Sequence, residues 1–388
     1  MKSASCVDDF ASSSCSEETA TIAQAAVMLP ADVIGRHIGS FLDRPTMNAL
    51  RITNREVCSS MMGMYQPWPM ARLPVGNTKK LGIQSLVFSP DGSSLACRSR
   101  GGTIQVWNRN TGKQIEWPCP GPLCFGNLSF SPDGRILACD GKGKSIRLFD
   151  VATGACIQSF QGHQGAITCL AFSTKETQLL ASGSTDSTIR LWDRTTNREH
   201  ATLHGHFGAV YSLDISTDGQ FLASGGTDRI LYVWNLQKVR DNTPCDFCQE
   251  LRGHEMTIVD VRFSDRWLVS ASLDATVRVW SRNRRSSGPR EPKRRAGNLS
   301  YSCHQIVRMS GEALCMKVLP HGRQLAVGTT DSKILVWDLD DNNEAEEGED
   351  DTPLSSPPVA TFSGKLFSFA PGVMATSSKD GSIQLQEC

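Results

Sequence analysis

Residues 168–193 read TCLAFSTKETQLLASGSTDSTIRLWD, and this stretch decides the fold of the chain. It contains an apolar run, a turn, a second apolar run, a tight polar turn and a third run, TIRLW. In the third run, branched apolar residues alternate with polar ones, which is the period of a β-strand with two different faces. The stretch therefore predicts three antiparallel strands of one small sheet.

The same layout occurs seven times along the chain. The third runs end at equivalent positions spaced by 42, 43, 42, 46, 57 and 49 residues: Trp107, Phe149, Trp192, Trp234, Trp280, Trp337 and Gln386. Turn sequences, SPDG at 89–92 and 131–134 and STDG at 216–219, separate the first run from the second. Because one small sheet cannot bury both of its faces, we expect the seven copies to stack radially and to cover one another.

These residues resemble the WD-repeat family of β-propellers. The resemblance covers about residues 66–388 and implies an all-β, seven-bladed propeller. In the family, a His, a Ser or Thr, an Asp and the Trp of one blade form a hydrogen-bonded tetrad, which satisfies the buried indole N–H. The matching sets in copies three to five are His163, Ser182, Asp186 and Trp192; His206, Ser224, Asp228 and Trp234; and His254, Ser270, Asp274 and Trp280.

The other copies depart from this pattern. Copies one and two carry Cys97 and Cys139 at the Ser position, and copy six carries Val327 there. We expect these blades to depend more on apolar packing. The family closes its ring with an N-terminal strand that completes the last blade, and WPMARLPV (68–75) is the candidate for that strand. Its removal should leave the last blade with an exposed edge.

Composition limits the function classes. Among 388 residues, Lys and Arg number 40 and so do Asp and Glu, so the whole chain has no charge bias towards nucleic acid or membrane. The chain contains no apolar stretch of about 20 residues and no apolar secretory signal, so we expect a cytoplasmic or nuclear protein. Its 14 Cys are scattered, and the pair Cys245 and Cys248 lacks the second pair that a zinc site needs.

No catalytic constellation stands out. Residues 141–145, GKGKS, fit the tight turn of copy two better than a phosphate-binding loop. The sequence therefore predicts a protein that is not an enzyme and that has no cofactor, metal or small-molecule substrate.

Ahead of the repeats lies an apolar, helix-like segment. Residues 1–26 are expected to form a disordered Ser-, Ala- and acid-containing tail, and residues 27–65 resemble an F-box, with Asn54-Arg55 near the end of the pattern. The resemblance implies docking on the adaptor of a cullin–RING ubiquitin ligase. The alternative is a helical cap on the propeller. The residues expected to dock are Leu29, Pro30, Val33, Ile34, Ile38, Leu42 and Leu50.

Family propellers usually bind partners on the face formed by the loops that enter the first strands and by the turns between second and third strands. We call this the loop face. Basic residues of copies seven, one and two could form one positive sector there, suited to a phosphorylated protein; ordinary solvated lysines are the alternative. The residues are Lys79, Lys80, Arg98, Arg100, Lys142, Lys144, Lys365 and Lys379.

Two charged insertions interrupt the later copies. Residues 282–298 are basic and residues 338–358 are strongly acidic, and both are expected to be mobile because they contain few apolar residues. The basic one could also serve as a nuclear import signal or contact nucleic acid; a solvated loop is the alternative.

Two functions follow. The main prediction is a substrate-recognition subunit of a cullin–RING ubiquitin ligase. The alternative is a WD-repeat scaffold of a nuclear or RNA-processing complex with no ubiquitin link.

Overall fold

The chain divides into two units, residues 1–67 and 68–388. The computed structural model describes residues 72–73, 83–99, 102–118, 128–174, 178–240, 249–264, 266–283, 300–319, 324–339, 358–364, 366–370, 373–377 and 382–387. All of them belong to the second unit. The predicted tail and F-box-like segment, with its seven docking residues, lie outside the described residues.

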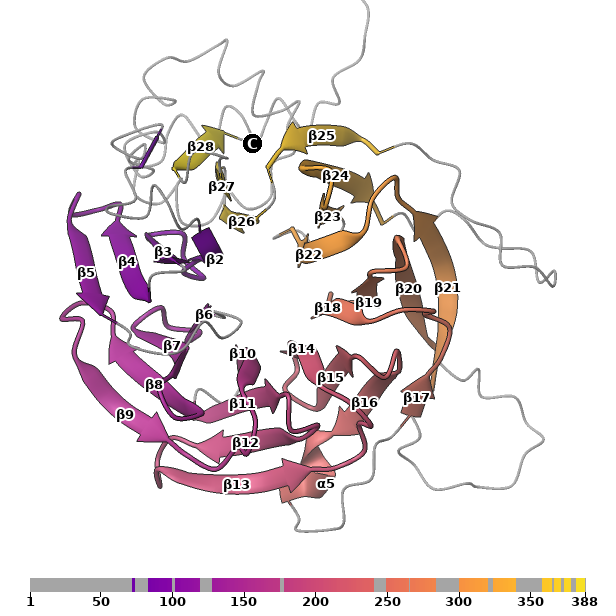
Figure 1. The fold of residues 1–388 in the computed structure, drawn as a ribbon, viewed down its shortest axis with the longest axis horizontal. Coiled ribbons are helices and arrows are strands. Elements are labelled where there is room, and N and C mark those ends of the chain that lie inside the picture. Colours follow the sequence, from indigo (N-terminus) through magenta and orange to yellow (C-terminus); the bar gives the residue numbers. More distant parts are fainter. Residues whose placement is uncertain are drawn as a thin grey trace, which may run out of the picture. The chain divides into compact units, whose positions relative to one another are not determined.

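The second unit is built from seven four-stranded antiparallel sheets, or blades, arranged in a ring (Figure 1). This confirms the predicted all-β, seven-bladed propeller. Blade 1 contains β2 (Ile83–Phe88), β3 (Ser94–Ser99), β4 (Thr103–Asn108) and β5 (Gln114–Pro118). Blade 2 contains β6 (Leu128–Phe130), β7 (Ile136–Gly141), β8 (Ser145–Asp150) and β9 (Cys156–Phe160). Blade 3 contains β10 (Ile167–Phe172), β11 (Leu179–Ser184), β12 (Ile189–Asp193) and β13 (Arg198–Leu203).

The remaining blades follow the same order, from the innermost strand outward. Blade 4 contains β14 (Val210–Ile215), β15 (Phe221–Gly226), β16 (Leu231–Asn235) and β17 (Gln249–Leu251). Blade 5 contains β18 (Ile258–Phe263), β19 (Trp267–Ser272), β20 (Thr276–Asn283) and β21 (Ser300–Arg308). Blade 6 contains β22 (Ala313–Val318), β23 (Gln324–Thr329), β24 (Lys333–Asp338) and β25 (Ala360–Ser363). Blade 7 contains β26 (Phe367–Ala370), β27 (Val373–Ser377), β28 (Ile383–Glu387) and β1 (Arg72–Leu73).

The ring is closed by the N-terminal strand of this unit. Strand β1 pairs antiparallel with β28, so Arg72 lies opposite Gln384 and Leu73 opposite Ile383. Leu73 is almost fully buried in a cluster that also holds core residues of blade 1. The segment 68–75 therefore supplies the closing strand that the sequence predicts.

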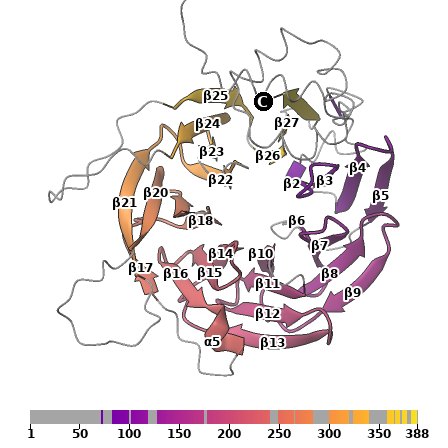
Figure 2. The ribbon, with the colours of Figure 1, turned by 180° about the vertical axis from the view of Figure 1, so that it is seen from behind.

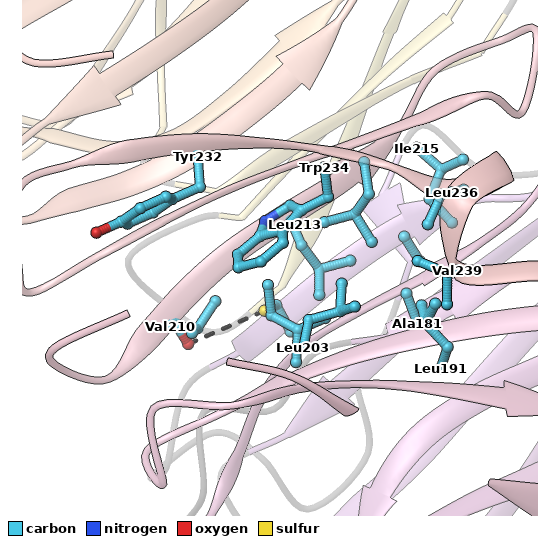
Figure 3. Close-up of a cluster of buried hydrophobic side chains, with 14 of the residues drawn as sticks. Ala181, Leu191, Leu203, Val210, Leu213, Ile215, Tyr232, Trp234, Leu236 and Val239 are labelled. Atoms are coloured by element: carbon cyan, nitrogen blue, oxygen red, sulfur yellow. Dashed lines mark hydrogen bonds between the residues drawn. The ribbon is translucent and has the colours of Figure 1, made fainter. Parts of the chain in front are cut away.

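Apolar side chains between neighbouring blades form the core. The cluster between blades 3 and 4 gathers Leu191 and Leu203 from one blade with Leu213 and Trp234 from the next (Figure 3). Such contacts bury both faces of the middle strands, which is why β11 and β15 are buried along their whole length. Each fully buried side chain of this size contributes about 1.5–3 kcal/mol relative to exposure.

A short helix, α5 (Leu236–Arg240), follows β16 at the periphery of blade 4 (Figure 2). Its Leu236 and Val239 pack into the same cluster as Trp234. None of the helical segments in the described part of the chain has the length and hydropathy that a membrane crossing requires.

Candidate protein-interaction face

Three blades contain complete tetrads. In blade 3, the Trp192 indole N–H donates to Ser182 Oγ (2.8 Å), which lies 2.8 Å from His163 Nε2. His163 Nδ1 in turn lies 2.9 Å from Asp186 Oδ2. Because the carboxylate can only accept, Nδ1 carries the proton and the Ser hydroxyl donates to Nε2. One chain of hydrogen bonds thus runs from indole to carboxylate.

Blades 4 and 5 repeat this geometry. The Trp-to-Ser distance is 2.9 Å in both blades, and the Ser-to-His distance is 2.8 Å. The His-to-Asp distances are 2.7 Å and 2.9 Å. The structure therefore brings together the four residues of each set that the resemblance implies: His206, Ser224, Asp228 and Trp234 in blade 4, and His254, Ser270, Asp274 and Trp280 in blade 5.

Each tetrad also braces the loop face. The Asp carboxylate accepts hydrogen bonds from the backbone of the loop that enters the first strand: from Gln164 N at 2.8 Å, from Phe207 N at 3.1 Å and from Glu255 N at 3.0 Å. The same Asp residues lie in the turns between second and third strands. Each carboxylate thus ties the two loop types of the face together.

The electrostatics of the blade 3 tetrad favour a neutral imidazole and an ionised carboxylate. Burial lowers the pKa of His163, which outweighs the opposing effect of Asp186. Burial by itself would raise the pKa of Asp186, but hydrogen bonds from Thr188 and His163 outweigh it and lower that pKa. The pair is therefore a structural link inside the blade: Ser182 is fully buried and His163 is almost fully buried, so both are shielded from solvent.

Blades 1 and 2 are joined by a buried ion pair, and this corrects one prediction. The sequence predicts Arg98 on the loop face, but this residue is only 1% exposed and its guanidinium pairs with the carboxylate of Asp140 from the neighbouring blade. Strand β3 is buried along its whole length, so a charged side chain in it needs a buried partner. Arg98 therefore holds two blades together and does not belong to a surface patch.

Two other predicted basic residues do lie on the loop face. Lys142 and Lys144 occupy the turn between β7 and β8 and are exposed. The ammonium of Lys144 donates to the Gln164 carbonyl of the next blade. Of the two side chains, Lys142 is therefore the one more available to a partner. The other five residues of the predicted basic sector lie outside the described residues: Lys79, Lys80, Arg100, Lys365 and Lys379.

The structure adds apolar residues to the loop face that the sequence reasoning missed. Phe207 directly follows the tetrad residue His206 and is 87% exposed, and Met256, two residues after His254, is 47% exposed. The guanidinium of Arg229, in the turn between β15 and β16, donates to the Glu255 carbonyl at 3.4 Å and links that turn of blade 4 to the entry loop of blade 5. Their position in the sequence could have predicted this exposure, because both residues closely follow a tetrad His, where the Asp carboxylate fixes the backbone and the side chain faces out.

No metal centre is formed by the described part of the chain, where no group of three or more His, Cys, Asp or Glu side chains could hold a metal ion. The CxxC pair Cys245 and Cys248 falls outside the described residues.

Comparison with protein families matches the description "WD domain, G-beta repeat" at residues 72–108, 154–193, 197–235, 245–281 and 299–338. This chain is a WD-repeat β-propeller. Each match begins at or near the outermost strand of one blade and ends at the third strand of the next. The two blades without a match ending in their third strand are blades 2 and 7, which carry Phe149 and Gln386 at the Trp position.

Several curated proteins are similar to parts of this WD-repeat propeller. THO complex subunit 3 of Arabidopsis thaliana is 30% identical over 133 residues, which is 33% of this chain and 36% of that protein. Nuclear distribution protein nudF of Aspergillus niger is 39% identical over 190 residues, 47% of this chain and 37% of that protein. Periodic tryptophan protein 2 homolog of Mus musculus is 27% identical over 127 residues, 32% of this chain and 12% of that protein. The matches thus span well under half of these relatives.

Proposed function

We propose that this WD-repeat propeller is a non-enzymatic scaffold subunit of a multiprotein assembly of the nuclear or RNA-processing kind, working in the nucleus or the cytoplasm. The observation that carries the proposal is the loop face, which tetrads hold rigid while Phe207 and Met256 project from it. Rigid, exposed apolar anchors are the features that bind protein partners most strongly. One relative, THO complex subunit 3, is named as a subunit of a complex, which agrees with this role.

A pair of variants tests the scaffold. Tagged full-length chain, a Phe207→Ala/Met256→Ala variant and an Ile157→Ala control should be purified from cells with their partners. Ile157 is 48% exposed on the outer strand β9, away from the loop face. We expect the double variant to lose partners that the control keeps. Identical partner sets for all three proteins would contradict the proposed face.

A second function, recognition of substrates for a cullin–RING ubiquitin ligase, is favoured by one specific feature. This is the F-box-like pattern that starts at Leu29-Pro30 and ends near Asn54-Arg55. The full chain and residues 66–388 alone should be compared for capture of the cullin and its adaptor. Capture by the full chain only would support the ligase role. If neither the full chain nor residues 66–388 captures the cullin or its adaptor, the ligase role is removed and the scaffold remains.

The basic sector belongs to this second function. Lys142 on the loop face, together with Arg100, would supply charge-assisted hydrogen bonds to a phosphorylated partner. An Arg100→Glu/Lys142→Glu variant should then bind a phosphopeptide ligand more weakly than wild type, whereas equal binding would exclude the sector as a phosphate reader.

A further inference from the structure

The first strands of all seven blades surround a cavity of about 230 Å³ at the centre of the ring. Figure 1 shows these strands, β2, β6, β10, β14, β18, β22 and β26, facing one another. Among the lining residues, the charged ones are Asp260, Arg262 and Lys317, and they come from only two neighbouring blades. The opposite wall is neutral, with Ser85 and Val87 from blade 1 among its residues.

The charged wall results from one strand position. In each blade, one residue of the first strand pairs with the Ser position of the second strand; in blades 4, 5 and 6 it is Leu213, Val261 and Met316. The next residue along the first strand is charged in these three blades: Asp214, Arg262 and Lys317. The equivalent residues of the other blades are uncharged: Val87, Ser129, Ala171 and Ser368. Blades 4 to 6 therefore place one carboxylate and two cations side by side at one level of the channel.

The two carboxylates near these cations, those of Asp260 and Asp214, already accept hydrogen bonds from other groups. Asp260 Oδ1 accepts from Ser212 Oγ and Val261 N, both at 3.0 Å, and pairs with Arg262 Nη2 at 3.0 Å. Asp260 Oδ2 accepts from the backbone N–H of Met316 at 2.8 Å.

Asp214 is similarly engaged. Its Oδ2 accepts from Phe263 N at 2.8 Å. Burial raises the pKa of this carboxyl, which weakens it as a counter-ion. The two cations thus share carboxylates whose acceptor positions other donors already use.

One cation of this arrangement is left without a partner. Within the described residues, Lys317 makes no hydrogen bond or ion pair, whereas Arg262 pairs with Asp260 through Nη2 and keeps a quarter of its side chain exposed. The charge of Arg262, with burial added, lowers the pKa of Lys317 to about 8. The Lys317 amine therefore lies in a positive field that a bound anion would relieve.

We infer that the central channel binds a small phosphate-type oxyanion between Arg262 and Lys317. A tetrahedral oxyanion would accept from the Arg262 guanidinium, whose side chain is 25% exposed, and from the Lys317 ammonium, each a charge-assisted hydrogen bond. The cavity volume is ample for such an ion. Because Arg262 belongs to blade 5 and Lys317 to blade 6, the ion would also bridge two blades. This ligand is separate from the protein partners proposed for the loop face.

Titration of the full-length protein with inorganic phosphate, at constant ionic strength in a chloride background, tests the site by calorimetry. We expect saturable binding that Lys317→Met weakens by about tenfold, the loss of one charge-assisted hydrogen bond. The matched control is Lys113→Met, at an exposed lysine between β4 and β5, and it should bind as wild type does. No binding to wild type, or equal binding by Lys317→Met, would overturn the inference.

A measurement on the unmutated protein covers the case in which Lys317→Met does not fold. After reductive methylation with ¹³C-formaldehyde, the Lys317 resonance should move on phosphate addition and its pKa should rise from about 8. A resonance that does not respond would overturn the site. O-phosphoserine, titrated in the same way, distinguishes two sources of the oxyanion: binding of both ligands indicates a phosphoryl group carried on a larger molecule, and binding of inorganic phosphate alone indicates the free ion.

Discussion

At the residue scale, the tetrad Ser is the position on which each complete blade depends most. Ser224 Oγ accepts from the Trp234 indole and is 2.8 Å from His206. Ser224→Ala removes both hydrogen bonds from a fully buried site, so the free energy of unfolding should fall by about 2–4 kcal/mol. Urea denaturation followed by tryptophan fluorescence measures the change.

The reverse substitution, which introduces a serine at the tetrad position, can be made in blade 1. Cys97 occupies the Ser position there, since Leu95 pairs with Trp107 as Leu222 pairs with Trp234. The buried Trp107 indole N–H has no acceptor among the described residues. Cys97→Ser should therefore leave stability unchanged or raise it by up to about 1 kcal/mol. If Ser224→Ala lowers the free energy of unfolding by no more than Cys97→Ser does, the tetrad does not stabilise its blade.

The buried imidazole of His163 predicts a loss of stability in mild acid. Burial lowers its pKa in the folded state, whereas the unfolded side chain takes up a proton near pH 6.5. Below about that pH the unfolded state binds more protons, so stability is fully present above pH 6.5 and falls as the pH drops. Urea midpoints at neutral pH and in mild acid should show this decline, and His163→Gln should flatten it. Equal slopes for the two proteins would contradict the assignment.

At the element scale, the sequence is informative wherever a repeat has a strict pattern. Alternation in TIRLW and its equivalents predicts the third strands, and the Gly-His and Trp positions predict the tetrads, because each contact lies within one blade. The alternation pattern does not predict the burial of Arg98. Both faces of β3 are buried, so alternation gives no outward face. Its partner Asp140 lies 42 residues away in another blade, a separation that no local pattern encodes.

The Arg98–Asp140 pair links β3 and β7 and gives a prediction for neighbouring blades. Asp140→Ala would leave a buried guanidinium without its carboxylate, and breaking a buried pair in this way typically costs about 3–5 kcal/mol. Replacing both residues, with Arg98→Met and Asp140→Leu, should cost much less because no charge stays buried. A double-mutant cycle in urea denaturation tests this. Additive effects would show that the two side chains do not act as a pair.

At the scale of the whole molecule, polar contacts supplement apolar packing between successive blades. Ser368 Oγ accepts from Phe88 N (3.0 Å) across the junction of blades 7 and 1, and Thr168 donates to the Val210 carbonyl between blades 3 and 4. Asp260 joins blades 4, 5 and 6 through Ser212 and the Met316 backbone. Since each sheet is also covered by its neighbours, blades should unfold together, and a break at one junction should weaken the ring as a whole.

The junction most open to a direct test is blade 7, whose sheet is completed by the N-terminal strand β1. A chain starting at residue 76 lacks the segment that pairs with β28, whereas a chain starting at residue 68 keeps it. Loss of buried Leu73 alone should cost about 1.5–3 kcal/mol, and the freed edge of β28 offers unpaired backbone groups to other chains. The shorter chain should therefore melt several degrees lower and form oligomers at rising concentration, as measured by calorimetry and light scattering. A synthetic peptide of residues 68–75 should restore part of the lost stability. Equal melting temperatures and monomeric behaviour of both chains would show that the propeller does not need β1 to close.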